Sequence, residues 1–66
     1  MSAPTDLAEC SAVRTQLDEL LDRIERVSER YRTTPDSAIC ADLDQVERGL
    51  VSARRAIERA IGTLDR

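Results

Sequence analysis

The chain has 66 residues, of which 41% are hydrophobic and 35% are charged, and it has no histidine. This length allows one small domain, whose core is marginal by itself because short chains bury a small share of their surface. The net charge of -3 argues against nucleic-acid binding, and the absence of histidine removes the usual catalytic triads and metal sites.

The N-terminus precedes the first periodic segment, and we expect residues 1–5 to be flexible. It has no basic start and no apolar run, so it is unlike a secretory signal. No stretch of the chain is apolar for long enough to span a bilayer. The sequence therefore predicts a cytoplasmic protein that does not enter a membrane.

The first predicted helix covers about residues 7–32. Its apolar residues recur at alternating spacings of three and four, the heptad pattern of helices that pack in pairs. They are Cys10, Val13, Leu17, Leu20, Ile24, Val27 and Tyr31. Asp6 is the expected N-cap, with Glu9 completing a capping box, and Arg30 lies in the last turn, where a cation suits the helix dipole.

The second predicted helix covers about residues 36–64. Thr34 is its expected N-cap and Pro35 lies in its first turn, a position that tolerates proline. The heptad pattern then runs to the end of the chain through Ile39, Leu43, Val46, Leu50, Ala53, Ile57, Ala60 and Leu64.

The two patterns fit each other when the chain folds back at residues 33–35. Val27 then meets Leu43, and Leu20 meets Leu50, so that the two heptads face each other along their whole length. A short connection also favours antiparallel neighbours. The sequence predicts an all-α, coiled-coil-like antiparallel two-helix hairpin, formed by residues 1–66 as a single domain.

The hairpin places the two cysteines, Cys10 and Cys40, near opposite ends. About 20 residues of helix separate them, hence roughly 30 Å, whereas a disulfide needs Cα atoms within about 7 Å. We therefore expect free thiols in a reducing cytosol. A bridge between two antiparallel hairpins stays open.

The heptad residues along which the two predicted helices meet form the predicted seam. A second, weaker apolar stripe lies beside it. It could simply widen the buried face, or it could be a docking surface for another helix. The predicted partner-binding residues are those of this stripe: Leu7, Leu21, Cys40, Val51 and Ile61.

The other side of the seam carries small residues, Gly49 and Ala56. They could tighten the hairpin or let a second backbone approach; a glycine in mid-helix costs roughly 0.5–1 kcal/mol, which argues for a packing reason. Arg30 and Asp42 are expected to form a surface ion pair across this side.

The side of the predicted partner-binding residues also carries two facing arginines, Arg14 and Arg54. We expect them to turn toward Asp18 and Glu58 on their own helices; the alternative is that they meet an acidic residue of a partner protein.

No constellation of residues suggests catalysis. The carboxylates lie mainly on solvated faces, and no glycine-rich phosphate loop is present. The sequence predicts a protein-binding hairpin that is not an enzyme and that takes no cofactor, metal or small molecule.

With the seam laid out, the chain resembles the small co-chaperones of type III secretion needle subunits. The more specific matches are Val13-Arg14, Leu50-x-Ser52-Ala53 with Ile57, Gly62 and Leu64, and the Pro35-Asp36 start of the second helix. The chain departs from that family in two places: the turn Arg32-Thr33-Thr34 has no glycine, and the second helix has no early aromatic residue.

The resemblance implies a partner and a role. Such proteins pair with a larger co-chaperone built of tetratricopeptide-type helical repeats, and together they keep the needle subunit monomeric in the cytosol. A marginal hairpin with spare apolar surface is stabilised by a partner that binds only its folded form.

Two other classes stay open. One is a self-associating hairpin whose two copies make a four-helix bundle, as in small plasmid copy-number RNA-binding proteins, which residues 36–40 faintly resemble. The other is the small non-catalytic subunit of exonuclease VII, suggested by residues 46–49, although the expected Gly-x-Leu segment before the second helix is missing.

Overall fold

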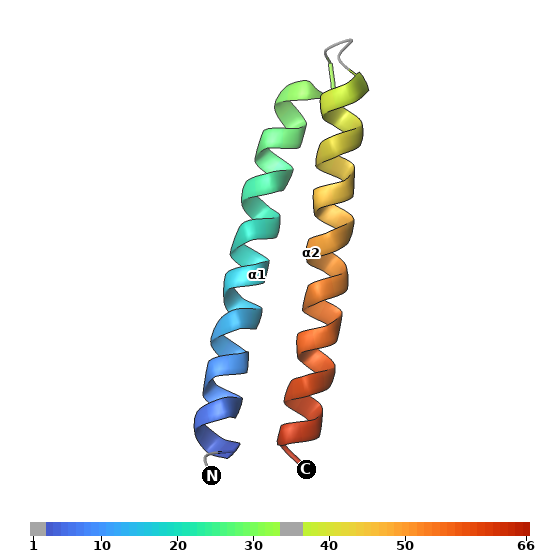
Figure 1. Ribbon diagram of the computed structural model, residues 1–66. Helices are drawn as coiled ribbons and strands as arrows, with labels where there is room; N and C mark the ends of the chain where they lie inside the picture. The colour runs from blue at the N-terminus through green and yellow to red at the C-terminus, as the bar shows by residue number, and fades with distance from the viewer. Residues whose placement is uncertain (1–2, 34–36) are drawn as a thin grey trace.

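The computed structural model describes residues 3–33 and 37–66. Two α-helices, α1 (Ala3–Tyr31) and α2 (Ser37–Leu64), pack side by side and run antiparallel, so that the start of α1 and the end of α2 lie at the same end of the molecule (Figure 1). The molecule is a rod of 52 × 14 × 13 Å. The predicted all-α two-helix hairpin is confirmed.

Helix α1 begins at Ala3, four residues before the predicted start at residue 7. Pro4 falls in the first turn, where its missing N–H costs no hydrogen bond. Asp6 also lies in the first turn, where its carboxylate suits the positive end of the helix dipole. Asp6 is therefore not the N-cap, and residues 3–5 belong to α1.

The other helix ends agree with the prediction to within one residue. At the end of α1 the N–H of Arg32 donates to the carbonyl of Glu29 at 3.4 Å, which closes a tight last turn. At the end of α2 the N–H of Asp65 donates to the carbonyl of Ile61 at 2.9 Å. The predicted capping role of Thr34 and the place of Pro35 lie outside the described residues.

The core between the helices is thin. Among the described residues, Leu43 is the one buried hydrophobic side chain, with 9% of its surface exposed. Its neighbours in the predicted seam are half-buried; they include Leu17, Ile24 and Val27 on α1 and Ile39, Leu50, Ile57 and Leu64 on α2.

The contact between the helices is rotated away from a third of the predicted seam, since five of its fifteen residues are exposed. Val13 and Leu20 are each 40% exposed and Val46 is 43% exposed. The neighbouring side is half-buried instead, at Leu7, Arg14, Leu21, Ser28, Glu47, Arg54 and Ile61. The covered side contributes Leu7, Leu21 and Ile61, whereas the exposed positions on α2 are Val46 and Ala53, whose burial would remove less apolar area from water.

Within the described ranges, neither helix has an apolar stretch of the length that a bilayer crossing takes.

Candidate functional site

One long side of the hairpin exposes apolar and small residues from both helices. We call it the open face and define it as Val13, Leu20, Val46, Gly49, Ala53 and Ala56, all of which are exposed. On α2 these residues follow one another at spacings of three and four, so they share one side of the helix. On α1, Val13 and Leu20 are two turns apart on the side that faces the same way.

Gly49 lies in the middle of the open face. A Cβ atom added to it would meet no atom within 4 Å, and the same holds for Gly62 near the end of α2. The packing of the two helices therefore does not require a glycine at position 49. The interpretation that this small residue tightens the hairpin is wrong, because the space beside it is open to the outside.

The opposite side contains the five predicted partner-binding residues. We call it the groove face and define it as Leu7, Leu21, Cys40, Val51 and Ile61. All five are half-buried. They therefore contribute more to the contact between the helices than the exposed residues of the open face do. The five residues do not form one continuous surface.

Two shallow hollows run between the helices on the groove face. Leu21 and Val51 line one of them, together with Asp18, Asp22, Glu25, Glu47 and Arg54. Cys40 lines the other, with Ser28, Arg32, Asp44 and Glu47. Leu7 and Ile61 line neither hollow. Most of the charged residues that line the two hollows are thus acidic, and Leu21, Val51 and Cys40 are the apolar residues among them.

One direct ion pair crosses the groove face. Nη1 of Arg54 donates to Oδ1 of Asp18 at 3.1 Å, and the two side chains are 37% and 52% exposed. The predicted pairing of Arg54 with Glu58 on its own helix is therefore wrong. An arginine stem is long enough to cross the groove, cover apolar surface and keep its guanidinium in water.

Two weaker contacts join the helices near the turn. The hydroxyl of Ser28 donates to Oε1 of Glu47 at 3.5 Å, and the thiol of Cys40 donates to the carbonyl of Tyr31 at 3.3 Å. Cys10 and Cys40 are both free thiols, as predicted, and both are half-buried. These contacts position the start of α2 against the end of α1.

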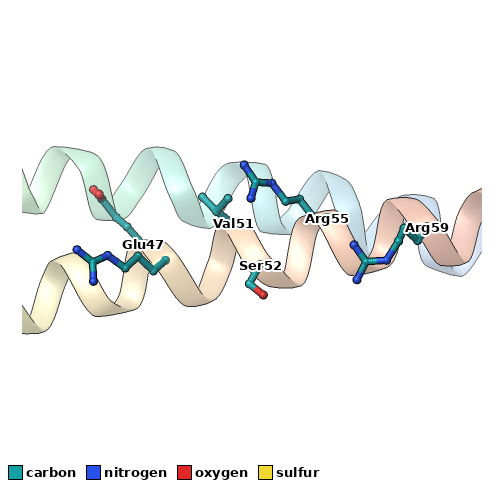
Figure 2. A pocket seen from close by; sticks show the side chains of 6 residues that line it. Glu47, Val51, Ser52, Arg55 and Arg59 are labelled. Carbon is teal, nitrogen blue, oxygen red and sulfur yellow. The ribbon is translucent and has the colours of Figure 1, made fainter.

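A shallow depression of about 560 Å³ lies on the outer side of α2 (Figure 2). Arg48, Arg55 and Arg59 line it with Glu47, Val51 and Ser52. The three guanidinium groups form a positive strip that the sequence interpretation missed, although the spacing of seven and four residues places them on one side of α2. The arginines are exposed, as on an ordinary solvated helix surface.

The described residues contain no group of histidine, cysteine, aspartate and glutamate side chains that could hold a metal ion. Comparison of the chain with protein-family models, with curated proteins and with solved structures finds no match.

Proposed function

We propose that the chain is a protein-binding hairpin, not an enzyme, and that its open face packs against a helix of another protein chain. One observation carries this proposal. The described side chains include a single buried one, Leu43, while Val13, Leu20 and Val46 keep 40–43% of their surface exposed along one side of the rod. Apolar surface arranged in such a stripe is characteristic of interaction sites.

The energetics support a partner. For so small a scaffold, hydrophobic burial and conformational entropy nearly cancel, and a single thin seam supplies little surplus. A ligand that binds only the folded form stabilises it by about 2.7 kcal/mol at a hundredfold excess over its dissociation constant. Binding through the open face would therefore both cover apolar surface and hold the hairpin in its folded form.

The co-chaperone role is the specific form of this proposal. It is supported by the residues that resemble the small type III secretion co-chaperones and by the two-helix architecture, which that resemblance implies. The partner would be a protein of tetratricopeptide-type repeats, which together with this hairpin would hold a needle subunit as a monomer. The two free thiols suit a reducing compartment and hence a cytoplasmic site of action.

The test uses the tagged chain, recovered from its native cells with whatever it binds. Leu20→Glu places a charge in the open face, while Ala12→Glu adds the same charge at an exposed position of α1 outside that face. We expect the first variant to lose the bound protein and the second to retain it, with circular dichroism as the check on helicity. Mass spectrometry of the bound chain identifies whether it contains helical repeats.

The groove face is tested in the same experiment by Leu21→Glu and Ile61→Glu. If these variants lose the partner while Leu20→Glu retains it, the interface lies on the groove face, as the sequence predicts. Full retention of the bound protein by all three variants, with helicity preserved, would contradict a protein-binding role for either face.

A further inference from the structure

We propose that the occupant of the open face is a second copy of this chain, so that two hairpins form a four-helix bundle with α1 of each copy lying over α2 of the other. This inference rests on the protein-binding role proposed above, and it places a second copy of the chain, instead of a repeat protein, on the open face. Three features of the molecule support it: the width of the apolar surface, its shape and its charges.

The apolar surface of α1 is wider than one partner helix can cover. Leu17 and Ile24 lie in the seam, with Leu21 on one side of it and Leu20 on the other. Helices of bundles carry apolar residues at about three of every seven positions, whereas a two-stranded seam uses two. Packing against α2 covers the side of α1 that carries Leu21. The side that carries Leu20 borders the same contact but remains exposed.

The open face has large residues on one helix and small residues on the other. Val13 and Leu20 project from α1, while Gly49, Ala53 and Ala56 leave a shallow strip on α2. Consider a dimer whose two-fold axis runs parallel to the rod. This rotation places α1 of each copy over α2 of the other and shifts neither along the rod, so that each contact occurs twice by symmetry. Leu20 of one copy then lies over Gly49 and Ala53 of the other, which pairs large residues with small ones.

The same rotation pairs opposite charges. Arg30 on α1 and Asp42 on α2 flank the open face near the turn, at almost the same level of the rod, and both are exposed. The ion pair predicted between them within one hairpin is not formed in the described residues. In the two-fold dimer, Arg30 of each copy faces Asp42 of the other, so the charges at the rim of the interface favour this arrangement.

The test compares two isomeric variants of the purified full chain by analytical ultracentrifugation. Gly49→Gln and Gly62→Gln have the same composition and charge, and in both a helix-favouring residue enters open space. We expect the unaltered chain and Gly62→Gln to sediment at twice the chain mass of 7.4 kDa. Gly49→Gln should weaken the dimer at least tenfold while its helicity in the monomer is kept or raised.

Leu20→Gln provides a second variant of the open face, and it should weaken the dimer in the same way. A monomeric unaltered chain at all accessible concentrations would overturn the proposal, as would dimers of Gly49→Gln and Leu20→Gln as tight as those of the unaltered chain. A monomeric chain whose Leu20→Glu variant loses a different protein in cells would overturn only the second copy as occupant and would leave the proposed function standing.

Discussion

Arg54 and Asp18 illustrate how single residues act in this hairpin. Their ion pair crosses between the helices at 3.1 Å, but both side chains are more than a third exposed. Solvent screening limits such a pair to about 0.2–1 kcal/mol. The pair therefore links the two helices across the groove face without supplying most of the stability.

Replacement of this carboxylate should have a small, salt-dependent effect. We expect Asp18→Asn to lower the free energy of unfolding by about 0.2–1 kcal/mol at low salt and by less at high salt. Urea titration followed by circular dichroism measures both values. Asp22→Asn, one turn away and without a bond across the groove, is the matched control, and a loss above about 2 kcal/mol for Asp18→Asn would contradict the account.

At the same scale, the sequence could place Arg54 beside the seam but could not choose its partner. Glu58 on its own helix and Asp18 on the other are both within reach of a long, flexible side chain. Gly49 shows a similar limit. Heptad spacing puts it next to the seam, but only the arrangement of the two helices reveals that nothing in the hairpin fills the space beside it.

The two helices were predictable as elements because their apolar residues follow a strict period over many turns. The end of α1 and the extent of α2 follow from the same pattern, with Tyr31 and Leu64 as the last residues of each. The start of α1 was missed because Asp6 suits an N-cap and the first turn equally well. The apolar stripe is wider than the contact between the helices. The heptad pattern therefore does not determine which edge of the stripe becomes buried, since both edges fit the pattern.

Leu43 should be the most sensitive position in the contact between the elements. We expect Leu43→Ala to lower the free energy of unfolding by about 2–5 kcal/mol, because it removes a buried side chain and leaves a cavity. Val46→Ala, one turn along α2 and 43% exposed, should cost the dilute chain much less. Thermal unfolding followed by circular dichroism compares the two, and a larger loss for Val46→Ala in the dilute chain would contradict the observed rotation of the seam.

The molecule is a 52 Å rod in which Leu43 is the one described residue that is buried and the open face is left uncovered. Folding and association are therefore linked: whatever covers the open face adds to the small stability of the hairpin. The sequence anticipated surplus apolar surface but assigned it to the groove face. Residue spacing does not reveal which of two apolar edges the second helix will cover, and this choice decides which edge faces outward.

Chemical labelling in the native cell tests most directly whether the open face is covered by protein. A cysteine is placed at Val46 in one variant and at the exposed neighbouring position Gln45 in another, with Cys10 and Cys40 as internal references resolved by peptide mass spectrometry. We predict that a maleimide modifies the cysteine at position 46 much more slowly than the one at 45, and that denaturation abolishes the difference. Equal rates at the two positions in the native cell would contradict the account.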